Sequence, residues 1–290
     1  MKKVEKYLFP KSVEECVKLL AEYKGEARLV SGATDLTLWI KEGKVSPSVL
    51  IDVSNIPEMR SVEVSGDTLV IGAAMTHAEI AANETVKKLF PSLSAGCLSV
   101  GSPQIRNLGT LAGNIVSAQP AADSVVPMTA LGASCELVGP EGKSVKPLSE
   151  LSVKVGVSNV DPTKEILTKI YIEIPKCRYG TSFKRIAQRE AMALPVINVA
   201  VLLKCDGAGK IAEARIVASP VAVIPFRAKK AEEFLCGKAP SAEILEEAAK
   251  MAGDEAAPRD SLQRGSGAYR KALVKDLVGQ ALTSAAASLA

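Results

Sequence analysis

The sequence has little of the material from which most catalytic and metal sites are built. Its 290 residues include a single histidine, His77, and the six cysteines are scattered, with no C-x-x-C pair among them. A Ser-His-Asp triad would need His77 and a nucleophile elbow, and a zinc or iron–sulfur site would need ligands from distant segments. We therefore expect no metal site, no catalytic side chain, buried reduced thiols, and a position near solvent for His77 in the first turn of a helix.

Long apolar runs and strong charge of one sign are also missing. The net charge is only +4, aromatic residues make up 4% of the chain, and no basic run is interleaved with aromatics, which argues against nucleic acid as a partner. The longest apolar runs, such as residues 193–203, are too short for a membrane span. Glu5 and Lys6 stand where a signal peptide would have its apolar stretch, so we expect a cytoplasmic protein.

The length and a hydrophobic content of 47% favour two domains, each with a core of its own. Up to Pro175 short strands and helices are mixed, whereas after Gly180 a run of strands is followed by a run of helices. The sequence thus predicts an α+β protein with domains at 1–176 and 177–290. For the second domain it predicts a three-stranded antiparallel sheet over 181–188, 196–204 and 211–218, and helices over 227–235, 241–252 and 262–287.

Two stretches run from apolar sequence into small residues. The first is Leu29–Leu36, LVSGATDL, in which Asp35 stands where it would cap a following helix, and the second is Ser102–Ile115, SPQIRNLGTLAGNI. We interpret both as turns. Turns of small residues let backbone N–H groups approach a ligand closely, and such groups bind anions.

Polar side chains in and after these turns suit a dinucleotide. Ser31 and Thr34 add hydroxyls to the first turn, Thr110 and Asn114 add a hydroxyl and an amide to the second, and Asp123 is an acceptor suited to a ribose hydroxyl. The G-x-G-x-x-G pattern of a Rossmann unit is absent, so the site would be a pyrophosphate clamp split between two segments. On the turns alone, a purely structural role is an equal alternative.

The motifs resemble those of a known family. Residues 105–115, with Pro120, Asp123 and Pro127 behind them, resemble the second flavin motif of the FAD-binding medium subunits of molybdenum hydroxylases, the carbon monoxide dehydrogenase and xanthine dehydrogenase family. Gly32–Leu36 resembles the first flavin motif. The resemblance continues in order over nearly the whole chain, at 182–185 with 193–201, 225–228 with Glu232, and 264–266 with Tyr269 and Arg270.

This resemblance implies a fold and a function. The fold is a two-lobed FAD-binding domain of the vanillyl-alcohol-oxidase type, whose lobes divide near residue 55, followed by a C-terminal domain of sheet and helices. The chain would be a flavoprotein subunit that takes electrons from an iron–sulfur small subunit and passes them to NAD or another acceptor, while a molybdenum-cofactor large subunit oxidises the substrate. Two alternatives stay open, a stand-alone flavin-dependent reductase on the same fold and a flavin-free structural subunit.

The resemblance also implies the cofactor-binding residues. The pyrophosphate would be wrapped by Val30, Ser31, Gly32, Ala33, Thr34, Asp35 and Leu36, with Thr34 and Asp35 at the centre. The second cradle would be Thr110, Gly113 and Asn114. Asp123 would bind ribityl or ribose hydroxyls, Val100 and Lys184 would lie near the isoalloxazine ring, and Leu167 or a neighbour on its strand would touch the flavin. Arg106 suits either a phosphate contact or a structural salt bridge.

The sequence departs from the family pattern at two alanines. Ala33 and Ala112 stand where the family often has glycine, and a positive φ at an alanine costs about 1 kcal/mol or more. We therefore expect a negative φ at both residues. The scattered cysteines also argue against the extra iron–sulfur segment found in one branch of the family.

Overall fold

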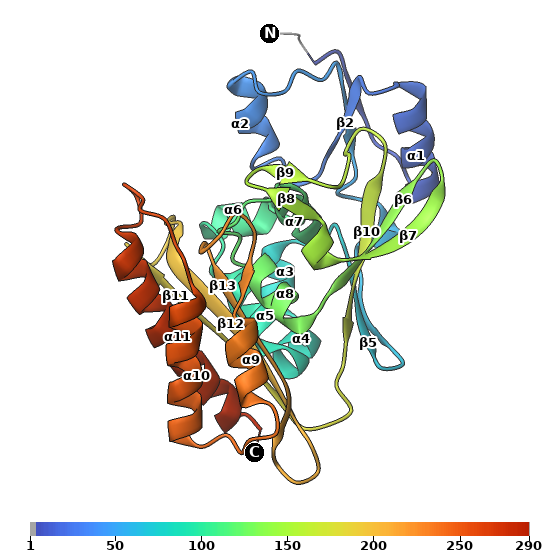
Figure 1. Ribbon diagram of the computed structural model, residues 1–290. Coiled ribbons are helices and arrows are strands. Elements are labelled where there is room, and N and C mark those ends of the chain that lie inside the picture. Colours follow the sequence, from blue (N-terminus) through green and yellow to red (C-terminus); the bar gives the residue numbers. More distant parts are fainter. Residues whose placement is uncertain (1–3, 290) are drawn as a thin grey trace.

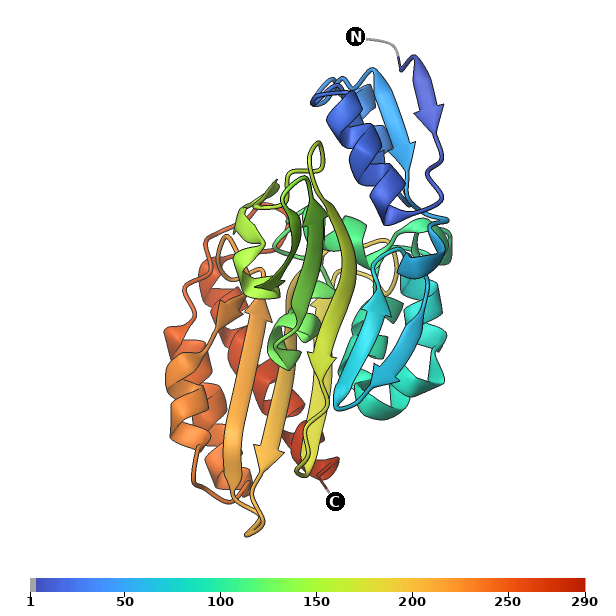
Figure 2. The same cartoon turned by 90° about the vertical axis from the view of Figure 1, so that its right-hand side faces the viewer.

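The structure is a computed structural model that describes residues 4–289. Residues 1–3 and 290, the outer ends of the two predicted domains, lie outside the described residues. The chain forms an N-terminal part of two lobes and a C-terminal domain of sheet and helices, and the first lobe stands at the top of the molecule, away from the C-terminal helices (Figures 1 and 2).

The first lobe is built on a parallel sheet of three strands in the order β1-β3-β2. Ser12 starts its first helix by accepting a hydrogen bond from the Glu15 N–H at 3.1 Å, and Cys16 and Leu20 of that helix are buried. The short strand β2 leads directly into the Ser31–Asp35 turn. Its elements are β1 (Lys6–Leu8), α1 (Val13–Glu22), β2 (Ala27–Val30), α2 (Leu36–Lys41) and β3 (Val49–Asp52).

The second lobe has an antiparallel sheet of five strands in the order β4-β5-β10-β6-β7, with a group of short helices beside it (Figure 1). The five strands of this sheet are β4 (Val62–Ser65), β5 (Thr68–Gly72), β6 (Ser134–Gly139), β7 (Gly142–Pro147) and β10 (Ile166–Glu173). The short strands β8 (Ser152–Lys154) and β9 (Val157–Ser158) pair with each other in a separate two-stranded sheet. The helices of the second lobe are η1 (Pro57–Met59), α3 (His77–Ala82), α4 (Glu84–Leu89), α5 (Pro91–Leu98), α6 (Pro103–Leu108), α7 (Leu111–Val116), α8 (Val125–Leu131) and η2 (Leu148–Glu150). One apolar core joins the two lobes, since Ile51 of the first belongs to the same buried cluster as Leu69 and Ile170 of the second.

The predicted turn at Ser102–Ile115 is mostly helical. Ser102 and Thr110 each act as an N-cap, through the N–H groups of Ile105 and Gly113, so the stretch folds into α6 and α7 with only Gly109 and Thr110 between them. Small residues with a hydroxyl every few positions suit short capped helices as well as turns. What remains of the predicted turn is the Gly109-Thr110 junction.

The C-terminal domain has four strands where the sequence predicts three. The fourth, β14, is only two residues long and pairs with β13 at Val217 and Ala218, so it is too short to leave an alternating pattern. The last helix begins at Gly267 and not at residue 262, because Ser266 caps it and Ser261 pairs with Gly265 in a turn. The elements are β11 (Tyr179–Ala187), β12 (Pro195–Cys205), β13 (Ile211–Ser219), β14 (Phe226–Arg227), α9 (Lys229–Leu235), α10 (Ala242–Glu255) and α11 (Gly267–Ala287).

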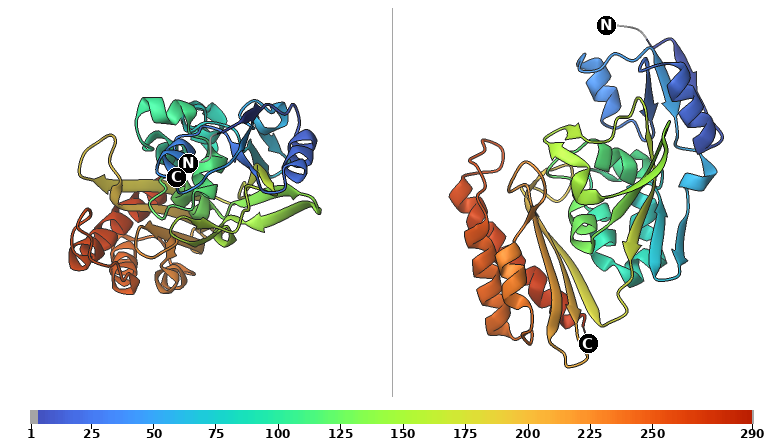
Figure 3. Two further views of the ribbon diagram at one scale, coloured as in Figure 1. Left: turned by 90° about the horizontal axis from the view of Figure 1, so that it is seen from above. Right: turned by 45° about the vertical axis from the view of Figure 1, so that its right-hand side comes forward.

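The two faces of the C-terminal sheet have different neighbours. Helices α9, α10 and α11 cover one face (Figure 3), while the other faces α8 of the second lobe, where Val126 and Ala130 pack against Ala200 and Val217.

All six cysteines are free; the expectation that all are buried is wrong for Cys177 and Cys236, which are exposed.

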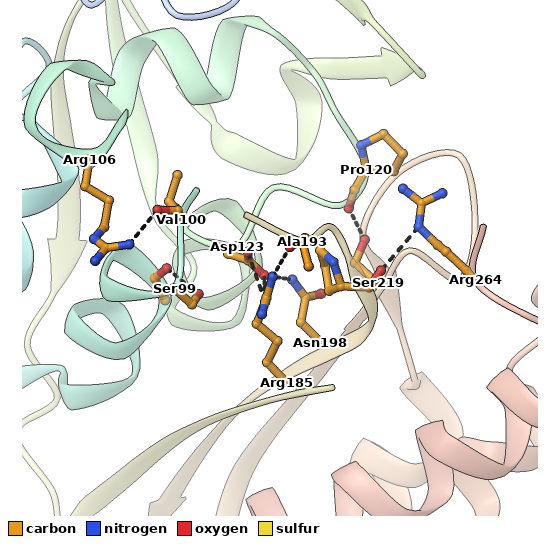
Figure 4. Close-up of polar contacts among 12 residues, drawn as sticks. Ser99, Val100, Arg106, Pro120, Asp123, Arg185, Ala193, Asn198, Ser219 and Arg264 are labelled. Carbon is orange, nitrogen blue, oxygen red and sulfur yellow. Dashed lines mark hydrogen bonds and ion pairs between the residues drawn. The ribbon is translucent and has the colours of Figure 1, made fainter. Parts of the chain in front are cut away.

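A buried polar cluster ties the two parts of the chain together. Asp123, in the loop before α8, accepts hydrogen bonds from Arg185 Nε at 3.2 Å and from Asn198 Nδ2 at 2.7 Å (Figure 4). Arg185 also donates to the Ala193 carbonyl. Burial raises the pKa of Asp123 to about 6, although Arg185 and Asn198 favour its charged form. The cluster fixes the relative position of α8 and the C-terminal sheet.

Replacing Arg185 should therefore destabilise the whole fold. Arg185→Ala leaves the Asp123 carboxylate buried without its cation, and we expect a loss of about 3–5 kcal/mol in the free energy of unfolding. Arg189→Ala, at an exposed arginine after β11, should change it by less than about 0.5 kcal/mol. Urea unfolding followed by circular dichroism measures both, and equal small losses would show that the cluster does not hold the parts together.

Candidate functional site

The first turn packs directly onto the junction between α6 and α7. A Cβ at Gly32 would collide with the carbonyl of Leu108, so only glycine permits this approach. A Cβ at Gly109 would lie 3.7 Å from Thr34 Oγ1, which shows how close the two segments are. Residues 31–35 and 109–110, far apart in sequence, thus form one surface.

This surface encloses a cavity of about 180 Å³. The structure brings nearly all of the predicted pyrophosphate and ring residues to its wall. The predicted residues that line it are Val30, Ser31, Gly32, Ala33, Thr34, Asp35, Leu36, Val100, Thr110, Gly113 and Asn114. We call this space the turn cavity.

The turn cavity contains donors that the protein itself does not use. Among residues 4–289, the backbone N–H groups of Gly32, Ala33, Thr34 and Asp35 make no hydrogen bond to another residue. Ser31 Oγ is buried and also lacks a partner. Asp35 precedes α2, but its side chain does not cap that helix, contrary to the sequence prediction. Because buried polar groups are nearly always paired, such a set indicates a ligand rich in acceptors.

The second segment, which includes α7, offers the turn cavity fewer free backbone donors than the first. Its backbone is largely occupied, since the Ala112 N–H donates to Ala73 and the Gly113 N–H to Thr110 Oγ1, at 3.1 and 3.2 Å. Asn114 Oδ1 accepts from Ser124 Oγ at 2.7 Å, which orients the amide and leaves its NH₂ group as a donor. The first segment thus offers backbone groups and the second mainly a side chain.

The expectation of a negative φ at Ala33 is wrong. Ala33 has a φ of +56°, whereas Ala112, inside α7, does not have a positive φ. The close approach of Gly32 to Leu108 forces the chain to turn sharply at the next residue, and Ala33 takes the left-handed conformation that glycine adopts without strain. The backbone path of a glycine turn is kept in spite of the alanine.

A wider cavity of about 880 Å³ adjoins the first. It lies between the N-terminal part and the C-terminal domain, and the two cavities share Asp35, Val100, Ile105, Asn114 and Ser117 as lining residues. We call it the interdomain cleft. The turn cavity and the interdomain cleft are therefore neighbours that have part of one wall in common.

Three predicted residues lie outside the turn cavity. Asp123 lines the interdomain cleft, where it is engaged by Arg185 and Asn198. Leu167 lines a separate cavity of about 90 Å³ behind the first turn. Lys184 lines none of these three spaces: its neighbours Phe183 and Arg185 face α8, and because strand side chains alternate, Lys184 points to the face covered by helices.

Arg28, Trp39 and His77 are among the residues of the turn cavity that sequence reasoning missed. The prediction that His77 lies near solvent is wrong, since it is 1% exposed and its Nδ1 has no partner. Burial and, secondarily, the nearby Arg106 lower the pKa of His77 to about 4. The only tryptophan and the only histidine of the chain both line the turn cavity. Their rarity in the composition is the one sequence signal that could have pointed to them.

Arg106 forms no salt bridge among the described residues; it donates to the Val100 carbonyl at 2.9 Å (Figure 4).

Comparison with known proteins decides the family. Residues 2–177 match the family described as FAD binding domain in molybdopterin dehydrogenase, and residues 182–285 match the CO dehydrogenase flavoprotein C-terminal domain. The chain belongs to the FAD-binding medium subunits of the molybdenum hydroxylases. It is therefore an oxidoreductase subunit whose cofactor is FAD.

Individual relatives of this medium subunit support the same family assignment. The nicotinate dehydrogenase FAD-subunit of Eubacterium barkeri is 31% identical over 83% of the chain and 82% of its own length. The carbon monoxide dehydrogenase medium chain of Afipia carboxidovorans is 29% identical over 97% of the chain and 96% of its own length. A solved carbon monoxide dehydrogenase from Hydrogenophaga pseudoflava superposes with a TM-score of 0.91 over 100% of both chains, at 29% identity.

The residues of this medium subunit fit FAD on structural grounds. A pyrophosphate needs several donors, and the unpartnered N–H groups of the first turn with Ser31 Oγ supply them. Arg28 adds a guanidinium to the lining of the turn cavity, and burial lowers its pKa although the charge of Asp161 acts in the opposite direction.

In residues 4–289 no helix is long and apolar enough to cross a membrane, and no three His, Cys, Asp or Glu side chains are grouped to hold a metal.

The two alanines of the medium subunit should respond oppositely to glycine. Ala33→Gly removes the strain of a left-handed alanine, and we expect the free energy of unfolding to rise by about 1 kcal/mol. Ala112→Gly places glycine inside α7 and should lower it by about 1 kcal/mol. Thermal or urea unfolding of the two variants measures this. Changes of the same sign would contradict the backbone described for Ala33.

His77 should make the apoprotein sensitive to acid. The unfolded chain binds a proton on His77 below its ordinary pKa of 6.5, whereas the folded chain resists it until about pH 4, so stability is lost as the pH falls between these values. The loss should reach roughly 3 kcal/mol. Urea unfolding at pH 7, 6, 5 and 4, compared with His77→Gln, isolates this contribution. If both proteins lose the same stability, His77 is not held neutral.

Proposed function

We propose that this chain is the electron-carrying flavoprotein of a three-subunit complex. In it, a molybdenum-cofactor large subunit oxidises the substrate, an iron–sulfur small subunit supplies the electrons, and NAD or another acceptor removes them in the cytoplasm. Solved relatives include a Cu,Mo-CO dehydrogenase and a carbon monoxide dehydrogenase that lacks the Mo-pyranopterin moiety of its molybdenum cofactor, which supports the large subunit. The six free cysteines are compatible with a reducing compartment.

The observation that carries the proposal is that the two cavities adjoin. The turn cavity would hold the pyrophosphate, and the interdomain cleft, which shares Val100 and Asn114 with it, would hold the ring end of the cofactor. FAD supplies the redox chemistry, since it exchanges electrons singly or in pairs. The chain has to bind the dinucleotide, exclude water from its phosphates and leave the ring end reachable from the cleft.

The lining of the cleft does not favour a stand-alone reductase. Such an enzyme needs a proton donor beside its substrate. The titratable side chains that line the cleft are aspartates and arginines, and Asp123 is held by Arg185 and Asn198. The unused donors of the turn cavity argue equally against a flavin-free structural subunit, because nothing else would satisfy them.

We further propose that domains 1–176 and 177–290 are the units of this flavoprotein, the first being of the vanillyl-alcohol-oxidase type. The turn cavity lies between residues of the lobe with the small parallel sheet and residues of the lobe with the larger antiparallel sheet, which supports this assignment. Within it, Thr110, Gly113 and Asn114 act as the second cradle and Leu167 touches the flavin only if its small cavity opens on binding. Lys184 would reach the ring only after a change in the path of β11.

Purification from cells that carry the neighbouring genes tests the proposal. We expect the chain to co-purify with a large and a small subunit, to carry FAD, and to have its flavin reduced by the complex's substrate only when the small subunit is present. Reduction without the small subunit would support the stand-alone enzyme. A protein that stays free of flavin after incubation with FAD would overturn the flavoprotein assignment.

Ser31→Ala separates ligand binding from folding. Removing a buried hydroxyl that lacks a partner should leave the apoprotein as stable as before, or more stable by about 1 kcal/mol. The same change should weaken FAD binding by about tenfold, because one donor to the pyrophosphate is lost. Ser46→Ala, at an exposed serine of the same lobe, is the matched control. Unchanged affinity in Ser31→Ala, measured by FAD fluorescence titration, would remove Ser31 from the site.

A further inference from the structure

The only histidine of the chain is held at the wall of the turn cavity by backbone contacts. His77 is the first residue of α3, and its N–H donates to the Gly109 carbonyl at 3.0 Å. The preceding residue, Thr76, pairs with Thr110 in an isolated bridge, so the start of α3 is joined to the junction between α6 and α7. The backbone thereby places the imidazole beside the segments that would hold the diphosphate.

The imidazole also lies close to the first turn. A Cβ at Gly109 would be 3.4 Å from His77 Cδ2 and 3.7 Å from Thr34 Oγ1, so the ring and the hydroxyl flank the same point of the junction. His77 and Thr34 both line the turn cavity. A ligand that accepts hydrogen bonds from the free N–H groups of the first turn would therefore lie beside the imidazole.

The polar atoms of the imidazole are not used by the fold. His77 is 1% exposed, its Nδ1 is buried without a partner, and its Nε2 makes no hydrogen bond within residues 4–289. Both ring nitrogens can donate or accept hydrogen bonds, and buried polar atoms of this kind are nearly always paired. The ring, like Ser31 Oγ in the same cavity, therefore indicates a ligand that supplies the missing partner.

The surroundings of the ring disfavour its protonation in the ligand-free chain. Burial and, secondarily, the guanidinium of Arg106 on α6 lower the pKa of His77 to about 4. Within residues 4–289 that guanidinium has no anionic partner, since its hydrogen bond goes to the Val100 carbonyl (Figure 4). The one carboxylate of α3, Glu79, is paired with Arg60.

The other neighbouring elements offer the ring little negative charge. The titratable side chain of α5 is Cys97, a buried thiol whose pKa is raised by burial, and α7 has none. Arg28 of β2 and Asp35 of the first turn line the same cavity, but burial raises the pKa of Asp35 and so weakens its charge. The charged side chains of α4 are all exposed, namely Glu84, Lys87 and Lys88.

A diphosphate in the turn cavity would reverse this balance. Its negative charges would offset the field of Arg106 and give the imidazole a nearby anion, which favours the protonated form. A neutral imidazole has one N–H, whereas an imidazolium donates from both nitrogens. A charge-assisted hydrogen bond from imidazolium to phosphate is also stronger than a bond between neutral groups.

We propose that His77 takes up a proton when the chain binds FAD and then donates a charge-assisted hydrogen bond to the diphosphate, so that cofactor binding is coupled to pH. This inference rests on the proposed function, which puts the diphosphate in the turn cavity. The proton comes from the buffer and returns to it when FAD is released. FAD affinity should therefore rise as the pH falls from 8 to 6, although the apoprotein loses stability in the same direction.

Isothermal titration calorimetry of FAD into the full-length apoprotein measures this coupling. Titrations at pH 6 in PIPES and in Bis-Tris, two buffers with different ionisation enthalpies, give the number of protons taken up. We expect an uptake of about one proton per FAD, and an affinity about tenfold higher at pH 6 than at pH 8. His77→Gln keeps a polar side chain that does not titrate, so both the uptake and the rise in affinity should be lost.

Two further variants make the result specific. Lys88→Gln, at an exposed lysine of α4, should leave FAD affinity and its pH dependence unchanged. Asp35→Asn removes the other side chain of the turn cavity that could gain a proton, and proton uptake should persist in this variant. Uptake that is lost in Asp35→Asn but kept in His77→Gln would assign the proton to Asp35 and overturn the inference.

Nuclear magnetic resonance of the wild-type chain tests the same point without a variant, and so remains valid if His77→Gln does not fold. With one histidine in the sequence, the imidazole ¹⁵N signals of the untagged chain belong to His77. At pH 6 they should show a neutral ring in the apoprotein and an imidazolium once FAD is bound. A ring that stays neutral at saturating FAD overturns the inference, while the flavoprotein assignment stands because FAD is bound. A wild-type chain that binds no FAD between pH 6 and 8 contradicts the proposed function instead.

Discussion

The contact between Gly32 and the carbonyl of Leu108 is the constraint on which the site depends. It lets the turn after β2 lie directly on the junction of α6 and α7, and any side chain at Gly32 would push the two segments apart. The left-handed conformation of Ala33 follows from the same approach, and so does the orientation of the N–H groups of residues 32–35. One close backbone contact thereby creates strain, a cavity and a set of unused donors together.

Unsatisfied polar groups mark both binding regions of this flavoprotein. In the turn cavity they are Ser31 Oγ, His77 Nδ1 and backbone N–H groups, and in the interdomain cleft the marker is Arg270 Nε. Two buried atoms outside these regions, Ser92 Oγ and Asn198 Oδ1, also lack a partner, whereas the Asp123 carboxylate is paired with Arg185 and Asn198. The turn cavity differs in that several unpaired donors lie together, which is the arrangement that a ligand rich in acceptors would satisfy.

The charged groups beside the interdomain cleft differ in how they are paired. The cluster around Asp123 contains an anion and a cation and joins α8 to the C-terminal sheet, because Arg185 of that sheet pairs with the carboxylate. Arg259, Arg264 and Arg270, which also line the cleft, form no ion pair among residues 4–289.

Much of this organisation follows from the sequence. The helix that begins at His77 and the helix over 241–252 appear as α3 and α10 where the sequence predicts them, and so do the alternating strands of the C-terminal sheet, because capping and periodic signals act within a few residues. The two small-residue stretches, read with the family resemblance, indicate FAD. The two-residue β14 and the break before α11 were not predictable, because a partner strand and a turn far from any periodic pattern decide them.

The sequence by itself determined the family, the cofactor and the segments of the first cavity, because these depend on residue types at fixed spacing. The tertiary structure alone decided the φ of Ala33, the burial of His77, the pairing of Asp123, the direction of Lys184 and the gathering of Arg259, Arg264 and Arg270 on one wall. Each of these depends on which distant segment packs against the residue, and no local pattern encodes that neighbour.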